Sequence, residues 1–227
     1  MSEADQLSHL PIIVVGGGGH AKVLIGTLLL QNRTVLGFVD LNQSRSPILG
    51  IANLGDDTVI LGYAVDKVRL VNGVGSIDST ARHRAIFQGF IEKGYVFENV
   101  IHPSAVVSSD VHLGNGVQIM AGAVLQPGIR LGDNVIVNTG ARVDHDCQID
   151  SHAHIAPGAT LSGHIHIGSG AHIGTGATII QGVKIGAGCI VGAGAVVVDD
   201  VPEGITVVGV PARPVKARNL IQEPNLI

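Results

Sequence analysis

The chain has 227 residues, of which 45% are hydrophobic but only 3% aromatic, and 32 are glycine. A formal net charge of −4 with 14% charged residues gives no basic footprint for nucleic acid. Its longest apolar run is too short to span a bilayer, its acidic N-terminus lacks the order of a signal peptide, and its two cysteines make no disulfide framework. These features predict a cytoplasmic protein without a nucleic-acid or membrane partner.

The first forty residues read as a β-α-β unit. A buried strand over 11–15 is followed by the glycine-rich run Gly16–His20, and a helix is predicted over 21–31. A second strand over 35–39 ends in Asp40. In such units a phosphate approaches the backbone at the helix N-terminus, and the acidic side chain meets a ribose or base. The spacing matches G-x-G-x-x-G only loosely, so tight packing of strand on helix is the alternative reading.

A third strand over 68–71, a helix over 79–93 and a final strand over 95–101 complete this part. Fewer than a hundred residues hold one half of a classical dinucleotide fold, so a mononucleotide is favoured over NAD. We expect an α/β nucleotide-binding domain (half-Rossmann) over 1–101 and a second domain over 102–227. No flexible linker separates them, which suggests that the two domains share a substrate.

From Ala105 to Asp200 the sequence divides into sixteen hexapeptides without an insertion. The third residue of each is Val, Leu or Ile, and the first is Ala, Val, Ile or Cys. Alternate side chains of a strand point to opposite faces, so positions one and three face inward, and Gly or Asn turns the corner. Three hexads close a triangular coil, and residues eighteen apart stack at about 4.8 Å. The pattern predicts a parallel β-helix, since a β-sandwich rarely keeps a period of six.

The two cysteines occupy inward positions of this repeat. Cys147 and Cys189 are 42 residues apart, which places them on different sides of the β-helix. Their separation exceeds the Cα distance of about 7 Å that a disulfide allows. Both are predicted to be small buried core residues rather than catalytic thiols.

Six short motifs, taken together, resemble one family. They are Gly16–His20, Phe38–Asp40, Ile101–Ala105, Asn138–Gly140, Val143–Asp146 and Gly209–Arg213. The combination is similar to the bacterial sugar-nucleotide acetyltransferases that include the bacillosamine and perosamine N-acetyltransferases and the sialic-acid O-acetyltransferase branch. The resemblance covers nearly the whole chain. It implies a left-handed β-helix, a homotrimer with active sites between subunits, acetyl-CoA as co-substrate, a UDP- or GDP-linked amino sugar as acceptor, and no metal.

The resemblance also implies a catalytic base. His145 stands between Asp144 and Asp146, and an amine or hydroxyl that attacks a thioester must lose a proton. The family pattern favours Asp146 as the carboxylate that orients His145, while the sequence alone leaves Asp144 open. Gly163 lies eighteen residues after His145, so bare backbone there would admit the thioester and donate an N–H to the oxyanion. Asp146 and His164 also stack and form a second candidate pair.

The remaining expected site residues follow from the same resemblance. His154 is expected near the acetyl group as a hydrogen-bond donor, with an exposed surface position as the alternative, and His20 faces the sugar or pyrophosphate or else caps the helix. The expected residues for coenzyme A are His154, Gly163, Gly174, Gly192, Pro211 and Arg213. Those for the sugar nucleotide are Gly17, Gly18, Gly19, His20, Asp40 and Gly73. Lys216 and Arg218 either join Arg213 at the phosphates of coenzyme A or form a solvated tail.

The reading with the most support is N-acetyl transfer, by direct attack in a ternary complex, to the amino group (at C4) of a nucleotide-linked amino-dideoxy sugar. The alternatives are a sugar O-acetyltransferase of the sialic-acid type, a non-catalytic trimeric binding protein, and a metal-dependent hydratase. The pairs His152–His154 and His164–His166 suggest metal ligands, but corner and face positions are not expected to converge. The other histidines of the repeat, His112, His152, His166 and His172, are expected on the surface. The motif spellings lean toward the perosamine-like branch and leave the base and the sugar open.

Overall fold

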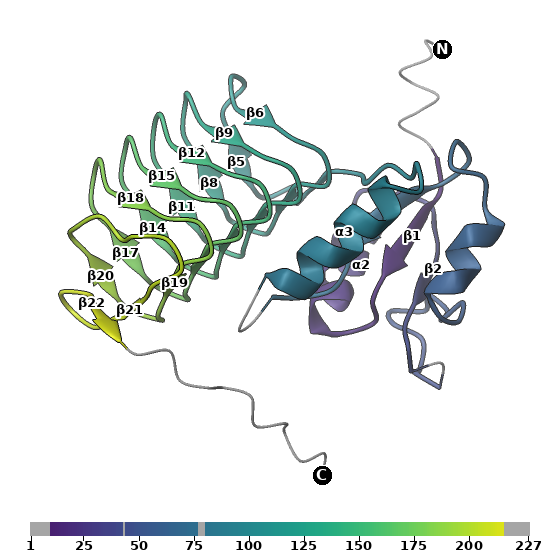
Figure 1. Ribbon diagram of the computed structural model, residues 1–227. Helices are drawn as coiled ribbons and strands as arrows, with labels where there is room; N and C mark the ends of the chain where they lie inside the picture. The colour runs from purple at the N-terminus through teal and green to yellow at the C-terminus, as the bar shows by residue number, and fades with distance from the viewer. Residues whose placement is uncertain (1–9, 43, 77–79, 216–227) are drawn as a thin grey trace.

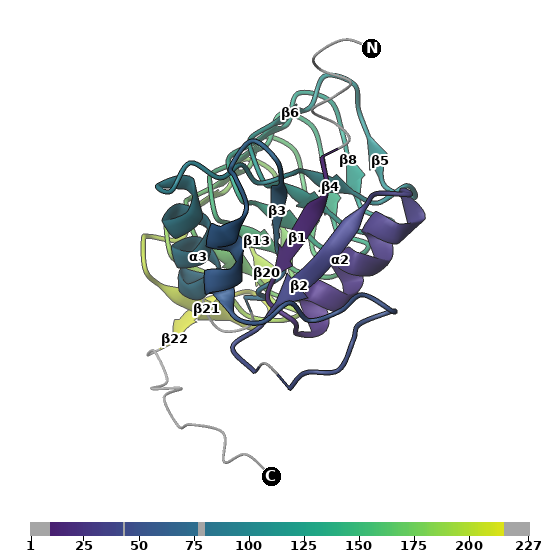
Figure 2. The same ribbon diagram turned by 90° about the vertical axis from the view of Figure 1, so that its right-hand side faces the viewer.

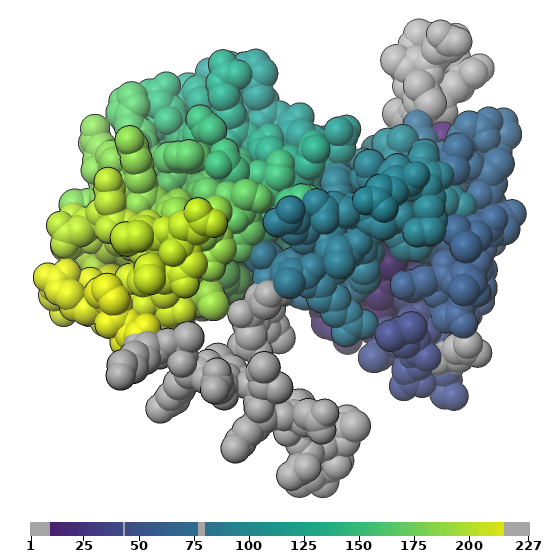
Figure 3. Space-filling view, in the orientation of Figure 1, coloured from purple at the N-terminus to yellow at the C-terminus, as the bar shows by residue number. Residues whose placement is uncertain are grey.

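The computed structural model describes residues 10–42, 44–76 and 80–215. An α/β domain packs beside the first coils of a three-sided solenoid, which continues away from it toward the C-terminus (Figure 1). Figure 3 shows the α/β domain, in blue, lying directly against the green coils. Among the described residues, no helix is both long and apolar enough to cross a membrane.

The α/β domain is built on a three-stranded parallel sheet with the order β2-β1-β3. Its strands are β1 (Ile12–Val15), β2 (Val35–Val39) and β3 (Arg69–Asn72), and its helices are α2 (Gly19–Leu30), α3 (Ala81–Ile91) and the 3₁₀ helix η1 (Asp57–Gly62). Every residue of β1 is buried, because α2 covers one face of the sheet while α3 and η1 cover the other. The two α-helices flank the sheet on opposite sides in Figure 2.

The predicted elements of this domain are confirmed in order, with one exception. The expected final strand over 95–101 is wrong: Phe97 makes a single bridge to Leu70, and only Val100 and Ile101 form a strand. That strand, β4 (Val100–Ile101), pairs with the solenoid and not with β3. The solenoid therefore begins a few residues earlier than the hexapeptide count suggests, and Val100 packs in the same cluster as α2. The domain limits at 101 and 102 stay a prediction.

The solenoid has three parallel sheets, one along each side of the prism. The first face contains β4, β7 (Gln118–Ile119), β10 (Ile136–Val137), β13 (His154–Ile155), β16 (His172–Ile173), β19 (Ile190–Val191), β21 (Thr206–Val208) and the antiparallel β22 (Arg213–Val215). The second face contains β5 (Val106–Val107), β8 (Val124–Leu125), β11 (Arg142–Val143), β14 (Thr160–Leu161), β17 (Thr178–Ile179) and β20 (Val196–Val197). The third face contains β6 (His112–Leu113), β9 (Arg130–Leu131), β12 (Gln148–Ile149), β15 (His166–Ile167) and β18 (Lys184–Ile185).

The register confirms the expected spacing of eighteen residues. His154 pairs with His172, and Ile155 with Ile173. The interior is filled by the first and third residues of each hexad, which form one continuous cluster of Ile, Val, Leu, Ala and Cys side chains. Cys147 and Cys189 are buried and free within it, as predicted. Burial raises the pKa of the Cys147 thiol to about 11, which keeps it protonated and unsuited to nucleophilic attack.

The sixth position of the hexad carries the left-handed backbone conformation at the corners. Ten hexads place glycine there with φ between 63° and 79°. Four hexads place another residue in this conformation, namely Asn134, Asp146, His152 and His164, with φ from 57° to 67°. A side chain in this region costs about 1–2 kcal/mol, with less for Asn and Asp, so each exception asks for a reason.

Candidate active site

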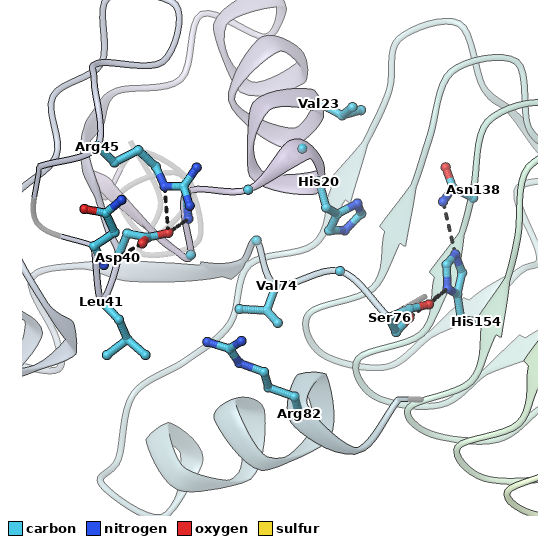
Figure 4. Close-up of a pocket in the computed structure, with 17 residues that line it drawn as sticks. His20, Val23, Asp40, Leu41, Arg45, Val74, Ser76, Arg82, Asn138 and His154 are labelled. Atoms are coloured by element: carbon cyan, nitrogen blue, oxygen red, sulfur yellow. Dashed lines mark hydrogen bonds and ion pairs between the residues drawn. The ribbon is translucent and has the colours of Figure 1, made fainter. Parts of the chain in front are cut away.

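A cavity of about 720 Å³ lies between the glycine-rich turn and the first face of the solenoid (Figure 4). Its lining residues come from three sources: the turn and α2, the loops after β2 and β3 with the start of α3, and the first face. They are Gly16, Gly17, Gly18, Gly19, His20, Val23, Asp40, Leu41, Asn42, Arg45, Gly73, Val74, Gly75, Ser76, Arg82, Asn138 and His154. All six residues expected to hold the sugar nucleotide therefore meet at one pocket.

The glycine-rich turn is fixed to the end of β2 through Asp40. The backbone N–H of Gly17 donates to Oδ2 of Asp40 at 2.9 Å, and Nε of Arg45 lies 3.1 Å from the same oxygen. Partial burial raises the pKa of Asp40, but hydrogen bonds from the Asn42 and Gly17 backbone and the charge of Arg45 outweigh it and hold the pKa below its ordinary value. A Cβ on Gly17 would lie 2.7 Å from the ring of Phe38, so this approach requires glycine.

Gly18 and Gly19 present bare backbone to the pocket where α2 begins. A Cβ at either position would meet nothing within 4 Å. The open side of these residues therefore faces empty space at a helix N-terminus, where backbone N–H groups and the helix dipole favour an anion. On the opposite wall Gly73 is packed tightly, since a Cβ there would lie 2.8 Å from Ala21 and Val14.

His20 joins the two domains. Its Nε2–H donates to Oε1 of Gln118 at 2.6 Å, and Nε2 of Gln118 donates to the carbonyl of Asn72 at 2.8 Å. Burial lowers the pKa of His20, and the Gln118 hydrogen bond opposes this only partly. His20 is thus a neutral residue in the first turn of α2, held at the pocket wall from the solenoid side.

His154 is buried where the α/β domain meets the first face. Oδ1 of Asn138 accepts the N–H of Thr139 at 2.8 Å, which turns the Asn138 amide N–H toward Nε2 of His154 at 3.0 Å. Nε2 therefore accepts, and the proton on Nδ1 faces the hydroxyl and carbonyl of Ser76 at 2.7 and 3.1 Å. Burial, reinforced by the neighbouring His172, lowers the pKa of His154 to about 3. In this tautomer no ring N–H is left for an acyl oxygen.

A second cavity of about 420 Å³ continues from His154 along the first face. It shares Ser76, Asn138 and His154 with the first cavity. Gly174 and Gly192, both expected near coenzyme A, line it beside the β19 residues Ile190 and Val191. The two cavities therefore adjoin at the three shared residues, one beside the glycine-rich turn and the other along the outside of the β-helix.

Two further residues expected at coenzyme A lie elsewhere. Pro211 and Arg213 line neither cavity and are exposed at the last coil, where Nη1 of Arg213 lies 3.5 Å from Oδ2 of Asp199. Within this chain the structure does not bring them to Gly174 or Gly192. Lys216 and Arg218 lie outside the described residues.

His145 lies at the corner between the second and third faces. Its Nδ1–H donates to Oδ2 of Asp146 at 2.8 Å, while its backbone N–H donates to Asp144 at 2.8 Å. Asp146 is therefore the carboxylate that holds the ring, and Nε2 is left unprotonated. A Cβ on Gly163 would lie 2.6 Å from Nε2 and Cε1 of His145, so the free nitrogen faces the bare backbone of the next coil.

The His145 corner and the pocket stand on opposite sides of the same subunit. The corner joins β11 on the second face to β12 on the third, whereas His154 and the pocket belong to the first face. In a three-sided prism, the corner between two faces is opposite the remaining face. Neither cavity reaches His145. One subunit alone therefore does not bring His145 to the pocket.

The other histidines divide into buried and surface residues. His152 is buried, contrary to expectation, because α3 covers it: its ring meets Phe87 edge-on at 5.6 Å, and Nδ1 lies 3.1 Å from Nδ2 of Asn134. His112 is exposed and His166 half-exposed beside Asp150, while His172 is half-buried under His154. The pairs 152–154 and 164–166 do not converge on a metal. Within the described ranges only His145, Asp146 and His164 bring three ligand atoms together.

Sequence reasoning missed the residues that join the domains and several charges at the pocket. Gln118, Ser76, Arg45 and Arg82 each lie in segments without a recognisable motif. Arg82 extends from the start of α3 toward Val74 and into the cavity (Figure 4). The one signal in the sequence is Gln118, a polar residue at an outward hexad position on the face that the α/β domain covers.

The buried histidines predict a pH dependence of stability. Burial lowers the pKa of His83 to about 4 and that of His154 to about 3, below the ordinary value of 6.5. The unfolded chain binds these protons first, so stability is lost as pH falls through 6.5. Between pH 7.5 and 5.5 each fully shifted histidine removes about 1.4 kcal/mol. Urea unfolding at both pH values tests this. His83→Gln should reduce the loss of stability between pH 7.5 and pH 5.5, whereas His112→Gln should leave that loss unchanged. Equal stability of the wild type at both pH values contradicts the prediction.

Comparison with known proteins agrees with this architecture. The bacterial transferase hexapeptide (six repeats) model matches residues 110–145, 128–163 and 164–199, and the PglD N-terminal domain model matches residues 11–86. The fold and the site thus define a hexapeptide acyltransferase with an α/β domain of the PglD type. No match was found among curated proteins.

Solved structures identify the family. The acetyltransferase domain of PglB from Neisseria gonorrhoeae is 38% identical, with a TM-score of 0.85 over 90% of this chain and 99% of that one. GDP-perosamine N-acetyltransferase from Caulobacter crescentus, solved with CoA and GDP-perosamine, is 39% identical, with a TM-score of 0.86 over 91% of this chain and 97% of that one. WeeI from Acinetobacter baumannii is 29% identical, with a TM-score of 0.76 over 91% of this chain and 100% of that one. The chain belongs to the sugar acetyltransferases of the left-handed β-helix type.

Proposed function

We propose that the protein transfers an acetyl group from acetyl-CoA to the C4 amino group of a nucleotide-linked amino-dideoxy sugar. The observation that carries this proposal is that the cavity at the glycine-rich turn adjoins the groove along the first face, with Ser76, Asn138 and His154 in the walls of both. The similar enzyme from Caulobacter crescentus, crystallised with CoA and GDP-perosamine, supports the same pair of ligands. A reaction that consumes these two metabolites fits a cytoplasmic enzyme.

The sugar nucleotide occupies the larger cavity. Its diphosphate lies at the N-terminus of α2, where Gly18 and Gly19 leave the backbone open and Arg82 adds positive charge. Asp40 and Asn42 lie where the ribose or base would be held, at the end of β2. The sugar then extends past His20 toward Asn138 and His154, which places its amino group at the junction of the two cavities.

Acetyl-CoA occupies the groove along the first face. Gly174 and Gly192 line it with bare backbone, at positions where a Cβ would strike the neighbouring coil, and Ile190 offers an apolar surface to the pantetheine arm. The acyl end lies near His154 and Asn138. Since Nε2 of His154 already accepts a hydrogen bond from Asn138, His154 acts by orienting that amide, whose second N–H can meet the acetyl oxygen.

A homotrimer completes the site. His145 is opposite the pocket within one subunit, so a second copy must bring its corner to the first face of its neighbour. Cyclic packing of three solenoids places three such corners at three pockets. Each active site then contains the pocket of one subunit with His145, Asp146 and Gly163 of the next.

The proposed reaction is a direct transfer that uses no metal. The neutral amine attacks the thioester carbonyl, the C–N bond forms, and a backbone N–H at Gly163 stabilises the oxyanion. Nε2 of His145 accepts the proton released by the nitrogen, and Asp146 stabilises the imidazolium through Nδ1–H. The C–S bond then breaks, and the sulfur leaves with a proton returned by His145. No covalent enzyme intermediate is needed.

The test is to measure thiol release from acetyl-CoA with UDP- and GDP-linked 4-amino-4,6-dideoxy sugars and with their 4-hydroxy counterparts. We expect turnover with one amino sugar, which also identifies the base, and an N-acetyl product by mass spectrometry. Turnover of the hydroxy sugars alone would replace the proposal with O-acetyl transfer. Silence with every acceptor, from protein that still binds acetyl-CoA, would refute it.

Arg82 provides a test of how the diphosphate is bound. Its side chain is exposed, lines the larger cavity and has no ion pair within 4.0 Å among the described residues. Arg82→Ala should raise KM for the nucleotide sugar at least about tenfold, because a charge-assisted hydrogen bond to phosphate contributes about 1.5–3 kcal/mol. KM for acetyl-CoA should not change. Arg84→Ala, on the same helix but outside the cavity, is the matched control, and equal KM values for both variants contradict the assignment.

A further inference from the structure

Three metal-ligating side chains meet at the corner between the second and third faces. Oδ2 of Asp146 lies 2.8 Å from Nδ1 of His145 and 3.6 Å from Nε2 of His164. The three ligand atoms all lie within 4.8 Å of one another. Each side chain is about half exposed in the single chain. His164 has no part in the proposed reaction.

The backbone at this corner is held in a costly conformation. Asp146 and His164 both have φ of 57°, at the hexad position where ten other hexads use glycine. The other two exceptions, Asn134 and His152, are buried and contact each other, so packing accounts for them. Asp146 is accounted for by its bond to His145. His164 gains only a 3.6 Å contact with Asp146 and an edge-on contact with the His145 ring at 5.0 Å.

The spacing suits a small divalent cation. Tetrahedral Zn²⁺ binds His nitrogen and carboxylate oxygen at about 2.0–2.2 Å, which puts neighbouring ligand atoms about 3.3–3.6 Å apart. The observed 3.6 Å lies at the upper end of this range and the observed 2.8 Å lies below it, so a small side-chain rotation that separates His145 from Asp146 completes the geometry. Gly163 leaves room beside His145, and a Cβ on Gly182, one coil beyond His164, would meet nothing within 4 Å. Water can fill the fourth position.

We propose that His145, Asp146 and His164 bind one divalent transition-metal ion of the Zn²⁺ type, and that the bound ion switches the transferase off. The binding site stands on this geometry alone, whereas the inhibition rests on the proposed function. The ion takes the lone pair of Nδ1, so the proton of that nitrogen moves to Nε2. The ring remains neutral, but Nε2 now carries a proton and cannot accept one from the sugar amine. Asp146 binds the ion instead of orienting the base.

The binding experiment uses tag-free protein, chelator-treated and without substrates. Co²⁺ is added while its visible d–d absorption is followed, and Zn²⁺ is then titrated to displace it. We expect one Co²⁺ per chain and displacement by Zn²⁺. His164→Ala should weaken Zn²⁺ binding at least about tenfold, since even an outer-shell partner of a metal site is worth 10–100-fold. His166→Ala, two residues away on the third face, is the matched control and should bind as the wild type does.

The activity experiment measures acetylated sugar by mass spectrometry, because the thiol of released coenzyme A itself binds Zn²⁺. Zn²⁺ should inhibit the wild type and His166→Ala, and EDTA should restore their activity. Inhibition of His164→Ala should need a Zn²⁺ concentration at least about tenfold higher. Mg²⁺, which prefers oxygen ligands, should not inhibit. The site is refuted if the wild type binds no Zn²⁺, or if His164→Ala binds it equally well. If the wild type binds Zn²⁺ but is not inhibited, the metal site stands, while the inhibitory switch and the assignment of His145 as the base are refuted. The binding experiment tests the metal site even if the enzyme acetylates none of the acceptors.

Discussion

Replacing His145 with alanine is expected to lower kcat/KM by about 10²–10⁴, the usual contribution of a positioned general base. The ring is held by Asp146 with Nε2 unprotonated, which is the state that accepts a proton. The loss should appear in kcat more than in the KM for either substrate, because the corner belongs to neither cavity. An amine needs less help from a base than a hydroxyl does, so activity that survives in part favours N-transfer.

The control for this variant is His166→Ala. His166 is half-exposed on the third face and bonded to Asp150 at 2.8 Å, so its loss removes a histidine of similar exposure without touching the corner. Thermal unfolding and the oligomeric state of both variants should match the wild type. If folded His145→Ala retains wild-type kcat/KM with the amino sugar, His145 is not the base.

Gly163→Ala is expected to reduce kcat by about 10²-fold, the scale on which a misplacement of about 1 Å costs catalysis. The new Cβ would lie 2.6 Å from Cε1 and Nε2 of His145, so the ring must swing away. The backbone itself does not require glycine, since Gly163 is the only glycine at the fifth position of the sixteen hexads. Because the His145 ring is about half exposed, its displacement should change the free energy of unfolding little.

A double variant shows whether this effect runs through His145. If the added methyl group acts by displacing the ring, Gly163→Ala should cost no further activity in a His145→Ala background. Additive losses would mean instead that the Gly163 backbone meets the thioester independently of His145. A Gly163→Ala enzyme with wild-type kcat would contradict the close approach seen at this corner.

The hexapeptide pattern determined most of the second domain in advance. Its period of six, with apolar first and third residues, gave the three faces, and the interval of eighteen correctly stacked His154 on His172. The same arithmetic placed Gly163 against His145. These predictions succeed because a solenoid repeats one local geometry, so that distance along the chain converts directly into position in space.

The contacts between the domains were not accessible in this way. His152 is buried because α3 and Phe87 cover its corner, and His154 is buried against Ser76, which is 78 residues away in the sequence. Nothing in the local sequence distinguishes these histidines from exposed His112. The expected strand over 95–101 failed for a related reason, since Val100 and Ile101 pair with β7 rather than with the sheet of their own domain.

An active site shared between subunits is the central feature of the proposed mechanism, and subunit mixing tests it. His145→Ala lacks the proposed base, and Thr175→Trp, at an exposed position lining the groove, is expected to block coenzyme A. The two inactive proteins are unfolded together, refolded in equal amounts, and assayed for acetyl transfer. If each site takes its pocket from one subunit and its base from the next, random trimers contain about one quarter of intact sites, and activity returns to about a quarter of the wild type. If mixed trimers form and remain inactive, the pocket and His145 of different subunits do not make one site.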